Sequence, residues 1–456
     1  MNEFFDKDER FRREGTTTVG RVGLVRSVLA RYRTEVIAFF MVAVLFVVAV
    51  ARLSQGAAAR RDPAAGMEEW YPQQAFYRKY YRVRRPTYEL SFISDDDRKS
   101  RRDPARLAFT STLLRGRLRP VVGADAGAGA GTGVEGYELE LREELAQNVT
   151  TTYNENGRGM ELSELCNYRD KLLAFDDRTG LVFWYSKAAN KMVPYVVLVE
   201  GSALDGDKGQ KTEWAFVAPG FLRGGQRKGR DVLYVGSIGK EWNDAKTGAI
   251  VNRNNQWVKI LDIRPAPAPE YGAGGATAAT GAAGTDGSNA EVQDYAEVVT
   301  VEHVNVRENL YEVMREQAGA LHPGYIVHEA ACYNRKYRNW WFLPRRHSRE
   351  PYSEAADEHA GTDLAFVVNT TDPFHATAAE NAAHMQVRHL GVHNSTHGWS
   401  SCKFLPYNED HLLATRSVEV NDVVATYATV IDITTGRILL PETFLGWKKY
   451  EGVEII

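Results

Sequence analysis

Apolar and polar residues alternate with a period of two along much of the chain beyond residue 86, which predicts β-strands. One clear pair of segments is Leu172–Phe175 and Leu181–Tyr185, and a second pair is Tyr427–Ile431 and Arg437–Leu440. Helical periodicity is confined to the N-terminus and to residues 306–319. The pattern therefore predicts an all-β domain with little helix.

Three turns between these apolar segments share the pattern Asp-x-x-Thr-Gly, at Asp176–Gly180, Asp244–Gly248 and Asp432–Gly436. The Asp side chain can accept hydrogen bonds from its own turn, and the Gly supplies a positive φ, so each turn predicts a hairpin. The turns are 68 and 188 residues apart. Those spacings fit a repeat of about 60 to 70 residues, which indicates propeller blades and leaves room for about five.

An unbroken apolar run at Val36–Ala51 predicts a membrane anchor. Extended over residues 34–53, it reaches the length of about 20 residues that a bilayer core requires. The alternatives are a buried helix and a cleaved signal peptide, but the run starts too late for a signal peptide. Eight Lys and Arg residues lie in residues 1–33 and three in residues 52–66, so the N-terminus is expected to stay cytosolic.

The anchor divides the chain into four expected parts: a cytosolic tail (1–33), a transmembrane signal anchor (34–53), a stem (54–85) and a β-propeller domain (86–456). Two low-complexity stretches, 123–136 and 264–290, are expected to be surface inserts, because they contain too few apolar residues to order themselves. The orientation is that of a single-pass type II membrane protein. It places three glycosylation sequons outside the cytosol, at Asn148, Asn369 and Asn394.

The composition is that of a globular protein, with 44% apolar and 25% charged residues among 456, and it excludes wholesale disorder. Lys and Arg number 56 against 59 Asp and Glu, so no basic excess indicates a nucleic-acid partner. Cysteines occur only at Cys166, Cys332 and Cys402. An odd number leaves at least one thiol free or paired between chains, and the simplest interpretation is buried, inert thiols.

Acidic residues beside strand aromatics or glycine recur about once per expected blade. Taken singly, each of these acidic residues is best explained as part of a solvent-exposed surface. Taken together, carboxylates on innermost strands would face a common channel and repel one another unless a cation compensates them. Oxygen donors favour calcium or magnesium. His393 and His397 have no evident third partner for zinc, and no phosphate loop, nucleophile elbow or His-Glu-x-x-His motif is present.

The acidic segments and their neighbours form a series of longer motifs. In chain order they are GRGMELSEL, FDDRTG, KTEW, YVGSIGKEW, HPGYIVHEA, WFLPRR, STHGWSSCKF and KYEGVEII. In sequence, order and spacing they resemble the soluble calcium-activated nucleotidase family, the apyrases of the five-bladed propeller type. The resemblance covers about residues 86–456 apart from the two inserts, and vertebrate members of the family share the short tail and signal anchor.

The resemblance implies a five-bladed β-propeller behind a signal anchor, with one central Ca²⁺ that takes one oxygen ligand from each blade. The corresponding positions here are Ser163, Glu213, Glu329, Ser400 and Glu451. It implies that Asp95 and Asp177 act on the attacking water. Arg178 and Arg345 would pair with phosphate oxygens, and Trp242 would stack the base. The run Asp95-Asp-Asp-Arg98 departs from the family, which has a hydrophobic residue between two acids and then Thr, so the substrate preference is open.

The expected function is that of a calcium-dependent nucleoside diphosphatase or apyrase that hydrolyses the terminal phosphate of nucleotides such as UDP and GDP. In the endoplasmic reticulum or Golgi lumen this would support glycosylation by removing the nucleotide product of glycosyltransferases. The alternative is a non-catalytic, calcium-stabilised propeller that binds a nucleotide or glycan. The sequence leaves open the preferred nucleotide, the compartment, release at the cell surface by stem cleavage, and whether the protein is a homodimer.

Overall fold

A computed structural model describes residues 86–122, 134–204, 206–222, 227–244, 249–266 and 297–456. The chain divides into two units, Met1–Trp70 and Tyr71–Ile456, and all described residues belong to the second. The expected tail, signal anchor and stem (1–33, 34–53 and 54–85) lie outside the described residues. Within the described part of the chain, no helix is long and apolar enough to cross a bilayer.

The described chain forms five antiparallel sheets of four strands each, which are the five predicted blades. Blade 1 contains β22 (Lys449–Ile455), β1 (Tyr88–Asp95), β2 (Phe109–Val122) and β3 (Val134–Thr151). Blade 2 contains β4 (Leu162–Tyr168), β5 (Lys171–Asp176), β6 (Leu181–Ser186) and β7 (Lys191–Val197). Blade 3 contains β8 (Trp214–Phe221), β9 (Arg227–Gly236), β12 (Trp257–Pro265) and β13 (Glu297–Asn305). Blade 4 contains β14 (Tyr325–Asn334), β15 (Asn339–Ser348), β16 (Leu364–Val368) and β17 (Met385–His389), and blade 5 contains β18 (His397–Leu405), β19 (Asn408–Val420), β20 (Val423–Asp432) and β21 (Ile438–Gly446).

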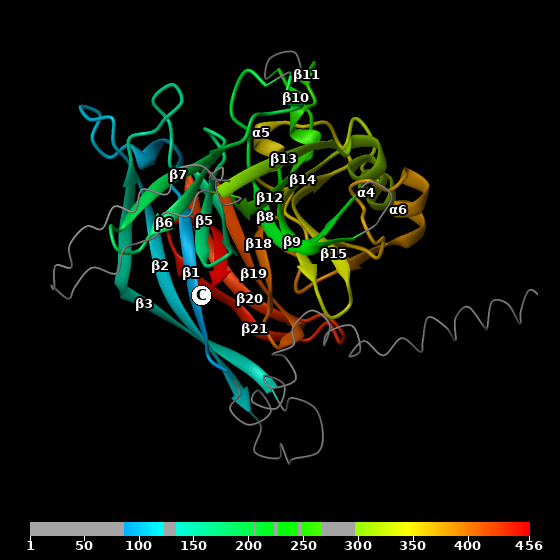
Figure 1. The fold of residues 1–456 in the computed structure, drawn as a ribbon. Coiled ribbons are helices and arrows are strands. Elements are labelled where there is room, and N and C mark those ends of the chain that lie inside the picture. The colour runs from blue at the N-terminus through cyan, green and yellow to red at the C-terminus, as the bar shows by residue number, and fades with distance from the viewer. Residues whose placement is uncertain (1–85, 123–133, 205, 223–226, 245–248, 267–296) are drawn as a thin grey trace, which may run out of the picture. The chain divides into compact units, whose positions relative to one another are not determined.

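The innermost strands of the five blades form a closed ring. Contacts run from β22 to β4, then to β8, β14 and β18, and back to β22. The ring closes through blade 1, because its innermost strand β22 comes from the C-terminal end of the described chain and pairs antiparallel with β1 (Figure 1). The innermost strands remain edge strands of their sheets, but the closed ring leaves these edges short and protected at the axis.

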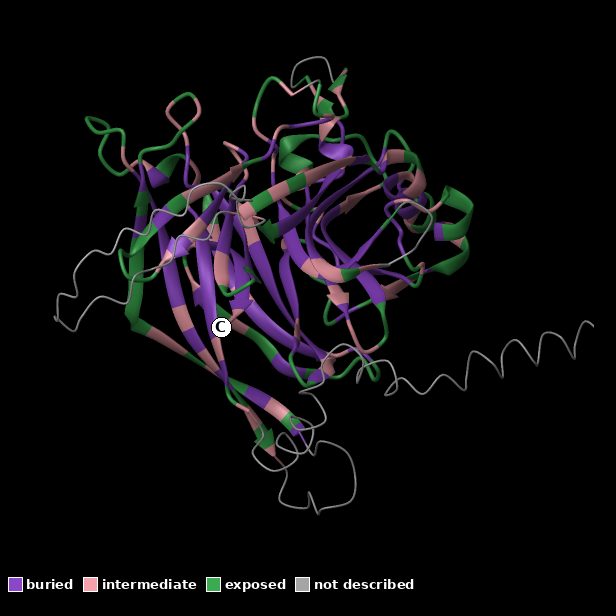
Figure 2. Ribbon diagram, viewed as in Figure 1, coloured by how far each residue is buried: buried purple, intermediate pink, exposed green. Residues whose placement is uncertain are grey.

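Each junction between neighbouring blades is filled by one apolar cluster. Ile93 and Leu165 belong to the cluster between blades 1 and 2, and Phe175 and Leu233 belong to the one between blades 2 and 3. Similar clusters fill the other three junctions. Buried residues therefore follow the inner strands, while exposed residues mark the loops and outer strands (Figure 2). The fold is held together by apolar side chains pointing sideways between blades, which leaves the axis for polar groups.

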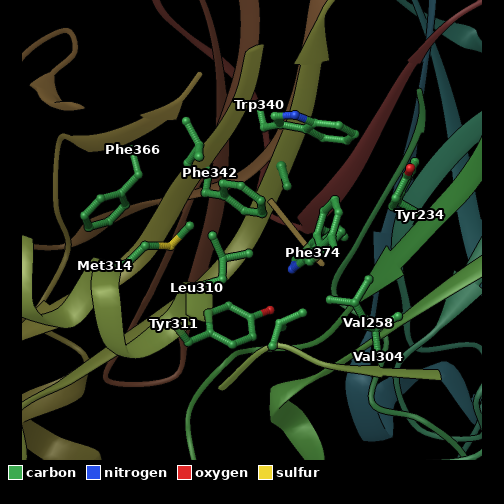
Figure 3. Packing of buried hydrophobic residues seen from close by; sticks show 14 of the residues in the cluster. Tyr234, Val258, Val304, Leu310, Tyr311, Met314, Trp340, Phe342, Phe366 and Phe374 are labelled. Atoms are coloured by element: carbon green, nitrogen blue, oxygen red, sulfur yellow. The ribbon is translucent and has the colours of Figure 1, made fainter. Parts of the chain in front are cut away.

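The largest of these clusters lies between blades 3 and 4 and includes a helical segment (Figure 3). A π-helical turn, η3 (Arg307–Tyr311), continues into α4 (Glu312–Ala318), and Leu310 and Met314 project from it into the cluster. Their spacing of four residues places both side chains on one face. Gly319 ends the helix with a positive φ of 67°. The helix predicted over residues 306–319 is thus confirmed, and its role is to seal this junction.

The predicted strands and turns are largely confirmed, but one inference drawn from the turns is wrong. In the turn at Asp176, the carboxylate accepts hydrogen bonds from the backbone N–H groups of Arg178 and Thr179, and Asp432 does the same for Thr434 and Thr435. However, the first turn joins the second and third strands of blade 2, whereas the other joins the third and fourth strands of blade 5. The turns recur because their local chemistry suits any hairpin, so their spacing is not the blade repeat.

The extent of helix differs from the sequence prediction. Besides η3 and α4, the described chain contains η1 (Asp97–Ser100), η2 (Asn254–Gln256), α5 (Glu354–Asp357) and α6 (Ala378–His384), together with a small sheet of β10 (Trp242–Asn243) and β11 (Ile250–Asn252). These helices have seven residues or fewer, too few to produce a helical period in the sequence. The two low-complexity inserts connect β2 to β3 and β12 to β13, at hairpins of blades 1 and 3.

The interpretation of the cysteines as three inert thiols is wrong for two of them. Cys332 of β14 and Cys402 of β18 form a disulfide that links the innermost strands of blades 4 and 5, with a Cα–Cα distance of 5.9 Å. Cys166 is a buried free thiol. The pairing is not evident from the sequence, because the two cysteines lie 70 residues apart and become neighbours only when blades 4 and 5 pack together.

We expect replacement of both disulfide cysteines, Cys332→Ala with Cys402→Ala, to lower the free energy of unfolding by about 4 kcal/mol. The estimate follows from the chain entropy of a closed loop of this length. Urea unfolding, with and without a reductant, measures the loss. Cys166→Ala is the control, and a wild-type unfolding curve that a reductant leaves unchanged would contradict the role of the disulfide.

Candidate metal centre and neighbouring acids

The five predicted ligands each lie on, or directly before, a different innermost strand. Ser163 is in β4, Glu329 in β14, Ser400 in β18 and Glu451 in β22, while Glu213 directly precedes β8. All five residues are buried. Since these strands form the closed ring, the structure brings together at the axis residues that are up to 288 positions apart in the sequence.

Four of the five positions are β-bulges. In β4, Leu162 pairs with Asp176 and Glu164 pairs with Phe175, so Ser163 between them has no partner in the ladder. The same interruption of register occurs at Glu329, Ser400 and Glu451. A bulge residue is released from the normal alternation of side chains and can be re-aimed. The bulges therefore allow these side chains to point to the axis while the next residue continues the strand.

The oxygen atoms of the five predicted ligands form a donor set suited to a hard cation. Carboxylate oxygens of Glu213, Glu329 and Glu451 lie within 4.8 Å of one another. The hydroxyl of Ser163 is buried without a hydrogen-bond partner, and that of Ser400 donates to Thr415 Oγ1 at 3.0 Å. Three carboxylates and two hydroxyls match the flexible all-oxygen coordination of Ca²⁺. The orphaned Ser163 hydroxyl indicates that a further group belongs at this point.

Three basic side chains compensate the buried carboxylates within the protein. Arg345 Nη1 donates to Glu329 at 2.6 Å and to Glu451 at 2.8 Å. Lys211 Nζ lies 2.5 Å from Glu213 Oε1, and Lys449 Nζ lies 3.6 Å from Glu451 Oε1. Arg345, predicted to bind phosphate, is thus placed on the carboxylates of the proposed ligands.

Burial sets the protonation of these acids more strongly than their basic partners do. It raises the pKa of Glu213 to about 8, against the opposing effect of Lys211 and with the support of Glu329. Burial likewise raises the pKa of Glu451 well above its ordinary value, although Lys449 opposes the shift. A raised pKa means that protons compete with a cation for these two carboxyls, so cation binding has to displace any proton that they hold.

A second group of acids lies beside the first. Carboxylate oxygens of Asp95, Asp97 and Glu161 are within 4.8 Å of one another, and Asp95 and Glu161 form an isolated β-bridge. Lys449 joins the two groups, because its Nζ also lies 2.7 Å from Asp95 Oδ2. Burial raises the pKa of Glu161 to about 7, and its hydrogen bond from Arg158 opposes this.

The second predicted catalytic acid, Asp177, adjoins this group. Its backbone N–H donates to the carbonyl of Glu161 at 2.9 Å, which fixes it beside the Asp95–Glu161 bridge. Its Oδ2 accepts from Lys211, whereas its Oδ1 is buried without a hydrogen-bond partner. The structure thus brings Asp95 and Asp177 together around Glu161, and Lys211 connects Asp177 to Glu213.

The other two predicted substrate residues are placed differently. Arg178 Nη2 pairs with Glu155 at 3.3 Å, and its Nε is buried without a partner, so one donor of the guanidinium remains available. Trp242 is in the two-stranded sheet of β10 and β11 outside the five blades, with 45% of its surface exposed and Lys208 Nζ 5.3 Å from its ring.

Sequence reasoning missed the lysines of the site, although a signal for them exists. Lys211 precedes Glu213 by two positions, and Lys449 precedes Glu451 by two. The repeated Lys-x-Glu spacing is therefore a signal for a lysine near two of the three axial carboxylates, Glu213 and Glu451. Glu161 and Asp97 were present in the quoted motifs, but nothing in the sequence pairs them.

Comparison with known proteins finds one matching family and several relatives that bear the names of nucleotide-hydrolysing enzymes. The sequence model of one family, described as Apyrase, matches residues 97–266 and 275–456. Soluble calcium-activated nucleotidase 1 of *Mus musculus* is 33% identical over 413 residues, which cover 88% of this chain and 84% of the mouse protein. An apyrase of *Cimex lectularius* is 32% identical over 370 residues, or 81% of this chain and 82% of that protein. The soluble calcium-activated nucleotidase 1 of *Rattus norvegicus* is 37% identical over 303 residues, which cover 66% of this chain and 60% of the rat protein.

We expect the affinity of this centre for Ca²⁺ to fall as the pH is lowered from about 8 to about 6, because a raised carboxyl pKa means that protons compete with the cation. Titration calorimetry in buffers of different ionisation enthalpy measures both the affinity and the protons released. Glu213→Gln should bind more weakly and release fewer protons. An affinity that is constant with pH would contradict the protonation described here.

Proposed function

Because the chain belongs to the apyrase family of nucleotide-hydrolysing enzymes, we propose that it is a calcium-dependent nucleoside di- or triphosphatase. The observation that carries the proposal is the convergence of Glu213, Glu329 and Glu451 on the axis, directly beside the acids Asp95 and Glu161. A bound cation can draw charge from phosphate oxygens, and a neighbouring acid can orient the attacking water, so the arrangement suits hydrolysis of a phosphoanhydride.

The acids next to the centre are assigned to the attacking water. Asp177 has a buried oxygen without a hydrogen-bond partner, which can accept a hydrogen bond from a water molecule. Asp95 is buried, and its Oδ1 accepts from the backbone N–H of Asp97 at 2.8 Å, which fixes its orientation. Either carboxylate can therefore orient the water and receive its proton. When bound, Ca²⁺ would draw negative charge from the phosphate oxygens.

The basic side chains are assigned to the phosphates and to charge balance. Arg178 retains an unpaired Nε–H in a buried position, so it can donate to a phosphate oxygen. Arg345 is held by Glu329, Glu451 and Glu419 through its Nη1 and Nη2 groups. We therefore assign Arg345 first to neutralising the carboxylates, with contact to phosphate as a secondary role. Stacking of the base on Trp242 remains part of the proposal and rests on its exposed ring.

We further propose that the substrates are UDP and GDP and that the protein is a single-pass type II protein of the secretory pathway, where it removes the nucleotide product of glycosyltransferases. Two structural features support an oxidising, glycosylating compartment. The Cys332–Cys402 disulfide is typical of such compartments. The three sequon asparagines, Asn148, Asn369 and Asn394, are all exposed, as glycan attachment requires.

We expect phosphate release from UDP, GDP, ADP or ATP with calcium, little release with magnesium, and none with a chelator. The purified protein is assayed with each nucleotide in turn. Glu329→Ala and Glu451→Ala should each lose the calcium-dependent activity, because each removes a carboxylate from the donor set. Full activity in both variants would contradict the metal centre. A wild-type protein that binds calcium but hydrolyses no nucleotide would instead favour the non-catalytic binding protein.

Replacement of Asp95 by Asn should lower kcat by about a hundredfold to ten-thousandfold, because it removes a group that positions or deprotonates water. The matched control is Asp96→Asn, since Asp96 is the next residue and its carboxylate pairs with Lys448 at 3.0 Å rather than with the axial groups. Steady-state kinetics at saturating calcium separates the two variants. Equal losses in both would show that the local charge, and not the Asp95 carboxylate, matters.

A further inference from the structure

A buried polar network lies one residue further along two of the ligand strands. Glu164 follows Ser163 in β4, and both of its carboxylate oxygens accept a hydrogen bond from Ser401 Oγ at 2.9 Å. The same carboxylate lies 3.2 Å from Lys403 Nζ and accepts from the backbone N–H of Leu165 at 2.8 Å. These contacts hold the Glu164 side chain in one orientation.

Ser401 joins three of the ligand strands. It follows Ser400 in β18, and its hydroxyl binds Glu164 of β4. The same hydroxyl oxygen accepts from the backbone N–H of Val453 in β22, at 3.4 Å. The strands that carry Ser163, Ser400 and Glu451 are therefore connected through one side chain, directly next to the proposed ligands.

The backbones of β22 and β4 are also in direct contact at this level. A Cβ atom added to Gly452, the neighbour of Glu451, would come within 2.7 Å of the Cα of Glu164. Only glycine allows this approach. The Cys332–Cys402 disulfide adds β14 to the same connection. Thus β18 is tied to three other ligand strands, and β8 with Glu213 stands outside this network.

Two of the proposed ligands, Ser163 and Ser400, directly precede residues of this network. Ser163 and Ser400 are bulge residues without a partner in the ladder, so the strand pairing does not by itself fix the direction of their side chains. Each is followed by a residue whose side chain is fixed in the buried network, Glu164 or Ser401. Removing a carboxylate from water costs several kcal/mol, and an apolar side chain could fill the same space, which points to a role beyond packing.

We propose that Glu164 and Ser401 are positioning residues, which hold the bulges of β4 and β18 so that the hydroxyls of Ser163 and Ser400 face the calcium. This inference rests on the calcium centre of the proposed function. Groups that orient metal ligands without touching the metal usually contribute about ten- to a hundredfold in metal affinity. Glu164 would therefore set the calcium concentration that the protein requires, without contact with the nucleotide.

The test is calcium binding to full-length Glu164→Gln, measured by titration calorimetry at constant pH. We expect the dissociation constant to rise about ten- to a hundredfold. The kcat for nucleotide hydrolysis at saturating calcium should stay unchanged. The variant lowers the affinity for calcium, but it does not alter the chemical step once calcium is bound. Ser401→Ala should act in the same direction, and Ser401→Thr, which keeps the hydroxyl, should restore most of the affinity.

The matched control is Glu454→Gln. Glu454 is a second buried carboxylate, on β22, and it shares the electrostatic influence of Lys403 with Glu164. Its hydrogen bonds come from the backbone N–H groups of Asn167 and Ile455 and not from Ser401, so it separates the charge near Lys403 from the contact to Ser401. Its replacement should lower the melting temperature and leave calcium affinity unchanged. Wild-type affinity in both Glu164→Gln and Ser401→Ala would overturn the proposal. A wild-type protein that binds no calcium would instead contradict the proposed function. If Glu164→Gln does not fold, the calcium affinity of Ser401→Ala alone tests the proposal. This variant removes a single oxygen atom and is therefore expected to fold.

Discussion

The repulsion between carboxylates that meet in a buried channel is the constraint on which the rest of the site depends. Glu213, Glu329 and Glu451 come together with little water around them, so each carboxyl needs a proton or a neighbouring positive charge. Arg345 and the two lysines supply such charges from the chain itself. Each of these cations is shared between at least two acids, so the chain itself balances part of the negative charge at the axis.

The same constraint explains why the inner strands are irregular. A regular strand alternates its side chains, and a ring of five such strands would direct both faces of each strand sideways into the blade junctions. The bulges at Ser163, Glu329, Ser400 and Glu451 interrupt the alternation at positions where an oxygen has to face the axis. Beyond each bulge the apolar clusters resume, so the centre is built with a minimal loss of core packing.

The sequence predicts much of this arrangement because the chemistry sits in short, contiguous motifs. The five ligand positions come from the motifs that carry the family resemblance, whereas the strands around the turns and the helix at 306–319 follow from local periodicity. The blade repeat could not be read from the Asp-x-x-Thr-Gly turns, since such turns suit any hairpin. The disulfide, the position of Arg345 on two glutamates and the network around Glu164 depend on contacts across the ring, which no local pattern encodes.

The pairing of β22 with β1 also has a consequence for the order of events during biosynthesis. A ribosome delivers β1 first and β22 last of the described strands, so the nascent chain holds four of the five axial donors before Glu451 emerges. Until then blade 1 lacks its inner strand and the acids already made are exposed to solvent. Completion of the cation centre therefore coincides with the last step of ring assembly. A cation can be held by all five donors only after the five blades have come together.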